Sequence, residues 1–206
     1  MAMNHPVQPV LNPVRLRDLR PTQMTVGMHE VQEKRQQWRD QKQAGQWLGH
    51  HLIPVVHGPG DTWWIIDHHH LARALYEEGV EEVLVTVEAR LGKLPKKRFF
   101  TVMDYYNWLH AYDGDGKRHD WSDLPKHVGK LEDDPFRSLA GAVRRGGGYA
   151  KTSTPYAEFL WADFFRDHIK RGAVEENFTS ALAKALRLAN SQKASYLPGF
   201  AGPEED

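Results

Sequence analysis

Three consecutive histidines carry the strongest chemical signal in the sequence. His68, His69 and His70 directly follow Asp67, and the apolar run Trp-Trp-Ile-Ile at 63–66 precedes them. The apolar run predicts a buried strand, and Asp67 before a helix-forming stretch predicts a helix N-cap. Imidazole rings would then lie beside the free backbone N–H groups at the positive end of a helix, where anions are stabilised. The motif therefore predicts a phosphate-binding site.

Each side chain of this motif has a candidate role. Neighbouring helical residues point about 100° apart, so only one or two of the histidines can face one ligand. We predict that His69 and His70 act as a base or bind phosphate, and that His68 also binds phosphate. Asp67 is either the N-cap alone or a catalytic carboxylate that, with His69, holds a divalent ion such as Mg²⁺, Mn²⁺ or Zn²⁺. Arg73, one helical turn further on, is either a solvated side chain or a phosphate ligand.

Two further segments offer polar side chains. Thr22 and Gln23 lie in a predicted loop between a strand and a helix, which either lines the phosphate site or is an ordinary turn. Arg137, Arg144 and Arg145 precede three glycines; they either form a basic lip over the site or complement the dipole at the end of a helix. No histidine spacing in the sequence matches a zinc motif.

The composition limits the classes of function. The 206 residues contain 27 Lys and Arg and 27 Asp and Glu, and this zero net charge argues against extended duplex DNA as a ligand. A nucleotide or a short single strand stays possible, and the sequence leaves the oligomeric state open. The absence of cysteine excludes disulfides, thiolate zinc sites and cysteine nucleophiles. Without an apolar run of about 18 residues or a secretory signal, we expect a cytoplasmic protein with no membrane span.

The elements that would position these residues form an α+β arrangement. The first part predicts strands near 14–17, 52–57, 62–67 and 82–88, with helices over 28–43 and from 68 to Gly79. The second part predicts helices over 101–112, 135–145, 155–171 and 174–189. We therefore expect a flexible arm at 1–13, a β-β-α-β domain at 14–98 and a helical extension at 99–206 packed on that domain.

The order of these elements and their motifs resemble the ParB/sulfiredoxin fold. The chain is similar to the family of ParB-like putative nucleases. The segments that carry the similarity are Leu-Arg-Pro-Thr-Gln at 19–23, Val-Gly at 26–27, Ile-Pro-Val-Val at 53–56, Asp-His-His-His-Leu-Ala-Arg-Ala at 67–74, Asp-Asp-Pro-Phe-Arg-Ser-Leu-Ala at 133–140 and Glu-Phe-Leu-Trp-Ala at 158–162. The resemblance implies the fold and a nuclease, hence a hydrolase, as the activity to expect.

Other proteins of this fold imply different chemistry for the histidine motif. Free serine kinases carry Asp-Gly-His-His-Arg, which Asp67, His69 and His70 match, and this similarity implies nucleotide phosphates near the two histidines. The kinases also use a glutamate base nearer the N-terminus, for which Glu30 is the candidate. Sulfiredoxins place a catalytic cysteine at the position of His69, so their chemistry is excluded.

Partitioning ParB proteins carry Gly-Glu-Arg-Arg-x-Arg-Ala at this position. His70 and Leu71 replace two of its arginines, which argues against the CTP-dependent switch of those proteins. The leading hypothesis is an enzyme acting at phosphorus, as a nuclease or as a nucleotide-dependent small-molecule kinase. The alternatives are a non-catalytic nucleotide-binding switch and a partner-binding module. The cofactors to expect are a divalent metal ion and a nucleoside di- or triphosphate.

Overall fold

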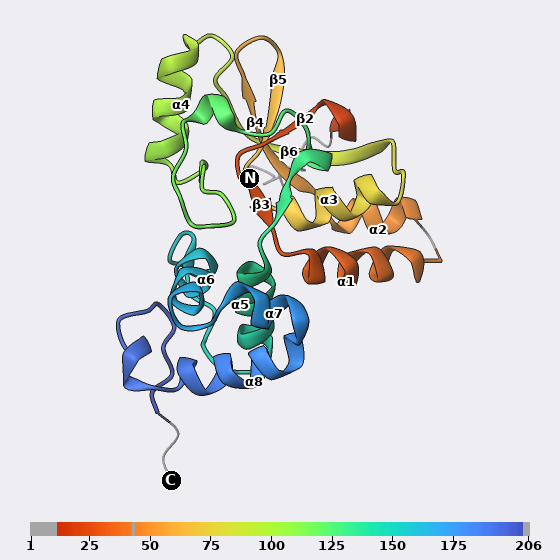
Figure 1. Ribbon diagram of the computed structural model, residues 1–206. Helices are drawn as coiled ribbons and strands as arrows, with labels where there is room; N and C mark the ends of the chain where they lie inside the picture. Colours follow the sequence, from red (N-terminus) through yellow and green to blue (C-terminus); the bar gives the residue numbers. More distant parts are fainter. Residues whose placement is uncertain (1–11, 43, 204–206) are drawn as a thin grey trace, which may run out of the picture.

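A five-stranded sheet forms the centre of the N-terminal half. The computed structural model describes residues 12–42 and 44–203 (Figure 1), so the predicted arm at 1–13 lies almost wholly outside the described residues. The strand order is β1-β6-β4-β5-β2. The strands are β1 (Asn12–Arg15), β2 (Leu19–Pro21), β4 (Ile53–Gly58), β5 (Thr62–Ile65) and β6 (Glu82–Arg90). The antiparallel β4–β5 hairpin and the parallel β4–β6 pair, connected through α3 (His69–Glu77), confirm the predicted β-β-α-β core.

Two helices pack side by side on one face of this sheet. These two helices are α1 (Met28–Arg39) and α3. The short helix α2 (Ala44–His50) follows α1 in the chain. Val31 from α1 and Leu75 from α3 are fully buried in one apolar cluster with Val55 of the central strand. The helix predicted over 28–43 is present but ends at Arg39.

The other face of the sheet is covered by α4 (Lys96–Tyr105). Phe99 and Met103 are fully buried and pack against Val56 and Trp64 of the sheet. The prediction of a helix over 101–112 is wrong in its bounds, because Pro95 provides the N-cap and Asn107, at a φ of 55°, lies just beyond the C-terminal end. α4 thus packs with the sheet and not with the later helices.

The C-terminal half is helical (Figure 1). It consists of α5 (Pro135–Arg145), α6 (Ala157–His168), α7 (Arg171–Glu176) and α8 (Phe178–Ala189). α5 packs against the other three helices, and Leu139, Trp161 and Phe165 are fully buried between them. The single helix predicted over 174–189 is interrupted, because Asn177 leaves the helical conformation and its side chain accepts the Ser180 N–H at 3.0 Å.

Short elements complete the chain. They are the 3₁₀ turns η1 (Leu16–Asp18), η2 (Trp121–Asp123), η3 (Val128–Lys130) and η4 (Gln192–Ala194), and the paired strands β3 (Thr25–Val26) and β7 (Glu132–Asp133). In the described part of the chain, no helix has the length and apolar character that a membrane crossing requires.

The two halves meet at the N-terminus of α1. The Met28 N–H donates to Asp133 Oδ1 at 2.9 Å, and the His29 N–H donates to Ser138 Oγ at 3.2 Å. These side chains from β7 and α5 satisfy donors that every helix N-terminus leaves unpaired. The contact is close because Gly27 has no side chain: a Cβ atom there would lie 2.6 Å from the Ser138 nitrogen.

Gly27→Ala should therefore destabilise the whole protein. The added methyl group meets backbone that cannot rotate away, and overpacking of this kind costs about 1–3 kcal/mol of the free energy of unfolding. Chemical denaturation measures the effect. Gly49→Ala is the matched control, because a Cβ atom at that position would extend into open space. Equal stability of Gly27→Ala and wild type would contradict the tight junction.

Candidate functional site

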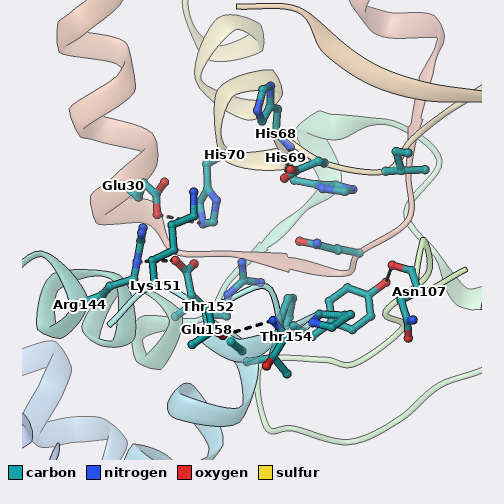
Figure 2. A pocket seen from close by; sticks show the side chains of 18 of the residues that line it. Glu30, His68, His69, His70, Asn107, Arg144, Lys151, Thr152, Thr154 and Glu158 are labelled. Carbon is teal, nitrogen blue, oxygen red and sulfur yellow. Dashed lines mark hydrogen bonds and ion pairs between the residues drawn. The ribbon is translucent and has the colours of Figure 1, made fainter. Parts of the chain in front are cut away.

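A cleft of about 680 Å³ separates the sheet from the helical half. The N-terminus of α3 lines one side, and the N-terminus of α6 with the preceding segment 151–156 lines the other (Figure 2). Its size is in the range of small-molecule and cofactor sites. Of the predicted site residues, those that line it are Gln23, Glu30, Asp67, His68, His69 and His70, and Arg137 and Arg144 of the basic lip, whereas Arg145 does not.

Two residues with unusual backbone conformations begin the helices at the cleft. His68 and Tyr156 are the N-cap residues of α3 and α6, and both have a positive φ, of 64° and 58°. Bulky residues rarely adopt this left-handed conformation, and such strain gathers at functional sites. The prediction of Asp67 as the N-cap is wrong by one residue: its Oδ1 accepts the His68 N–H at 2.7 Å, outside the helix.

The rings of His69 and His70 accept hydrogen bonds from the backbone. His69 Nε2 accepts the Thr22 N–H at 3.2 Å, and His70 Nε2 accepts the Gly27 N–H at 2.9 Å. Burial is the main cause that lowers the pKa of His69 to about 3 and the pKa of His70 well below its usual value. Both rings are therefore neutral, and their Nε2 atoms hold the chain between β2 and α1 instead of facing a ligand. The geometry gives no support to their predicted roles as base and phosphate ligand.

The structure keeps two of the predicted ligands out of the cleft. Arg73 donates to Glu77 Oε1 at 2.8 Å and to the Leu131 carbonyl oxygen, so it fixes the segment before β7. Thr22 is buried, and its hydroxyl donates to the Ile65 carbonyl oxygen at 2.7 Å. Gln23 does line the cleft, and its Oε1 is buried with no hydrogen-bond partner among the described residues.

The most unusual charge of the cleft is Arg137, on the first turns of α5. Its side chain is only 5% exposed, and within residues 12–42 and 44–203 no carboxylate forms an ion pair with it. Its Nη1 makes one long bond of 3.4 Å to the Thr25 carbonyl oxygen, its Nε has no partner, and the guanidinium lies 3.6 Å from the centre of the Phe159 ring. Burial lowers the pKa of Arg137, as expected for a cation removed from water.

Two carboxylates and three more cations lie along the same end of the cleft. Lys34, Arg144 and Lys151 are the cations, and Arg144 Nε is 2.8 Å from Glu158 Oε1. Glu30 lies 3.8 Å from His70 Nε2 (Figure 2), but the neutral ring forms no ion pair with it. Burial, and then the charge of Glu158, raise the pKa of Glu30. A carboxylate with a raised pKa accepts a proton more readily than a solvated one, which suits it to the role of a base.

The opposite end of the cleft is aromatic. Trp108, Tyr156 and Phe159 line it beside Asn107, and the Tyr156 hydroxyl donates to the Asn107 carbonyl oxygen (Figure 2). The positive φ of Asn107 needs no functional explanation, because asparagine often follows the end of a helix. The sequence patterns singled out neither Trp108 nor Lys151, and Glu158 appeared only in the family resemblance. No local pattern marks Trp108 or Lys151, and the fold alone brings them to the cleft.

The residues predicted to hold a metal ion do not form a metal cage. The Asp67 carboxylate accepts the His68 N–H, and His69 Nε2 accepts the Thr22 N–H. Nowhere in the described part of the chain do three or more His, Asp or Glu side chains gather as a possible metal site. The side chains of both predicted ligands instead accept hydrogen bonds from backbone N–H groups.

Comparisons with known proteins agree with the resemblance seen in the sequence. The family model described as "Putative ParB-like nuclease" matches residues 12–167, which include both sides of the cleft. Among solved structures, the crystal structure of protein Atu1540 from Agrobacterium tumefaciens is similar, with a TM-score of 0.91 and 47% sequence identity over 96% of this chain and 100% of that chain. No curated protein matches the sequence.

The buried neutral histidines should make stability depend on pH. An imidazole whose pKa is lowered in the folded state takes up its proton on unfolding, so folding stability falls as the pH drops from about 6.5 towards 3. In His69→Gln, the amide oxygen can still accept the Thr22 N–H but does not titrate. We expect its unfolding free energy, from denaturation at several pH values, to fall less steeply, by up to about 1.4 kcal/mol per pH unit.

The comparison isolates His69, because the other buried histidines titrate in both proteins. His110, whose pKa is also lowered to about 3 mainly by burial, is one of these. Identical slopes in wild type and His69→Gln would show that His69 is accessible and charged in the folded state.

Proposed function

The chain belongs to the ParB-like nuclease family, and we propose that it binds a nucleotide, or one nucleotide of a short single strand, in the cleft and acts at its phosphorus. Four cations and two helix N-termini face the cleft, where a phosphate would be stabilised. The single observation that carries the proposal is the buried, unpaired guanidinium of Arg137. Glu158, Asp134 and Glu30 act on this charge, but no carboxylate of the described residues contacts it as an ion pair. A buried charge without a contacting counter-ion is costly, and an anionic ligand in the cleft would supply one.

The two ends of the cleft match the two ends of a nucleotide. The cations Lys34, Arg144 and Lys151 lie with Glu30 at one end, and Trp108 follows Asn107 at the other (Figure 2). A phosphate would bind at the first end, and a base could contact the aromatic side chains that line the second. Gln23 Oε1, a buried acceptor without a partner in the described part of the chain, could receive a hydrogen bond from the ligand.

Glu30 is the group best placed to move a proton. Its pKa, raised by burial and then by the charge of Glu158, makes the carboxylate a stronger base than a solvated glutamate, and the neighbouring cations limit this rise. It would deprotonate the attacking water or hydroxyl, while Arg137 stabilises the negative charge that develops on the phosphoryl oxygens. The role of His70 is to position the start of α1, and thus Glu30, through the Gly27 N–H.

The same groups would also support phosphoryl transfer to a small molecule. A carboxylate base beside a phosphate site can accept the proton of an alcohol as well as that of water, and the cleft has lining groups of both charges. Assays with short single-stranded oligonucleotides and with nucleoside triphosphates plus hydroxyl-bearing amino acids, each in the presence of Mg²⁺ or Mn²⁺, separate hydrolysis from transfer. Tight binding without turnover in either assay would instead indicate a non-catalytic nucleotide-binding protein.

Arg137→Met should remove binding without unfolding the protein. We expect the affinity for nucleoside phosphates, measured by calorimetry, to fall at least about tenfold, because the buried guanidinium provides a charge-assisted contact. The free energy of unfolding should stay within about 1 kcal/mol of wild type, since removal of an unpaired buried charge offsets the lost contact with Phe159.

Arg145→Met is the matched control for Arg137→Met. Arg145 follows on the same helix, is exposed, and pairs with Glu33 at 3.0 Å outside the cleft. Its loss should leave nucleotide affinity unchanged. Wild-type affinity in Arg137→Met would overturn the proposed phosphate site.

Glu30→Gln should separate binding from turnover. We expect turnover to fall about 100-fold or more while affinity stays the same or rises, because a negative charge beside the phosphate is removed. In wild type, the rate should increase as the pH rises through the raised pKa of Glu30 and the carboxylate forms; this limb should vanish in Glu30→Gln. Glu33→Gln, on the exposed side of α1, serves as the control, and unchanged turnover in Glu30→Gln would exclude it as the base.

A further inference from the structure

An exposed pair of stacked aromatic rings lies at the C-terminal end of α4. The rings of Tyr106 and Trp108 are 4.6 Å apart and inclined by only 16°. Trp108 packs on the apolar cluster below α4, whereas Tyr106 is 62% exposed. The tyrosine ring therefore has a free face toward solvent, although the burial of aromatic rings is ordinarily favourable.

The backbone fixes this stack in place. The Asn107 N–H donates to the Asp104 carbonyl oxygen at 3.0 Å, and the Trp108 N–H donates to the Met103 carbonyl oxygen at 2.8 Å. This pair of bonds is the Schellman motif that ends a helix, with Asn107 in the left-handed conformation. The chain reverses there, which brings the ring of Trp108 back beside that of Tyr106. The stack is thus preorganised and costs little side-chain entropy on binding.

The stack continues the ligand cleft. Trp108 lines the aromatic end of the cleft, and Tyr106 extends the aromatic surface beyond it. The charge of Asp104, one turn before the stack, is opposed by Arg118 at 3.8 Å. Any ligand on this surface would be held mainly by stacking and not by charge.

We propose that the Tyr106–Trp108 stack binds a second base of a single-stranded nucleic acid whose neighbouring nucleotide occupies the cleft. This inference rests on the proposed function and names its substrate class: single strands longer than one nucleotide. Bases stack on aromatic side chains without regard to sequence, and a platform adjoining a phosphate site is a common way to hold single strands.

A length series tests the platform. Binding of fluorescent thymidine monophosphate and of thymidine oligonucleotides from two nucleotides upward is measured for wild type, Tyr106→Ala and Tyr106→Phe. We expect the alanine variant to lose about tenfold in affinity for oligonucleotides but less than about twofold for the mononucleotide, the size of effect seen when one base–aromatic stack is removed. Tyr106→Phe should restore oligonucleotide binding. Tyr196→Ala, another tyrosine at 72% exposure, should match wild type throughout.

Each outcome decides between the two proposals. Oligonucleotide affinity that is unchanged in Tyr106→Ala, or that does not grow with length in wild type, would overturn the platform while leaving the nucleotide site intact. A protein partner on this surface would give the same result. Failure of wild type to bind even the mononucleotide would overturn the proposed function, and the platform with it. The loss in Tyr106→Ala should also persist at high salt, because stacking releases no counterions.

Discussion

Two neutral imidazoles hold the walls of the cleft in place. His69 and His70, at the start of α3, accept backbone N–H groups from Thr22 and Gly27 and so fix the segment between β2 and α1. A protonated ring has no free acceptor, so the arrangement depends on keeping both histidines uncharged. Burial achieves this by lowering their pKa values. The bond from Gly27 to His70 thereby holds the start of α1, the helix that carries Glu30 and contacts the helical half.

The energetically least favourable feature of the cleft, a buried charge without a contacting counter-ion, lies in the helical half. The direct contacts of the Arg137 guanidinium among the described residues are a carbonyl oxygen and an aromatic face, while Glu158, Asp134 and Glu30 act on its charge only from beyond ion-pair distance. By contrast, the neighbouring Asp134 has its carboxylate fully used: it caps α5 through the Phe136 N–H and pairs with Arg166 at 2.7 Å. Two buried charged residues three positions apart thus differ in whether the protein completes their interactions. The residue left incomplete is the one that lines the cleft.

The sequence was sufficient to predict many of the helices and strands, but not the hydrogen-bond partners of their side chains. The hairpin of β4 and β5, the helix after it and α5 followed from apolar periodicity, proline and glycine, all of which act locally. The histidine motif correctly located one wall of the cleft. Its roles could not be derived, because the donors that His69 and His70 accept lie more than 40 residues away in sequence. For the same reason, Arg73 looked like a phosphate ligand, although tertiary packing turns it to Leu131.

The division of the cleft between two layers of structure has a consequence for comparison across proteins of this fold. The histidine motif lies at the start of α3, in the half of the chain that is built on the sheet. Arg137, Lys151 and Glu158 come from the helical half that follows. A shorter relative could inherit the first part alone, retain every histidine, and yet lack the charged residues with which this cleft is built. In such a relative, a triple histidine alone would not indicate the chemistry of this cleft, which depends on the arginine at the start of α5.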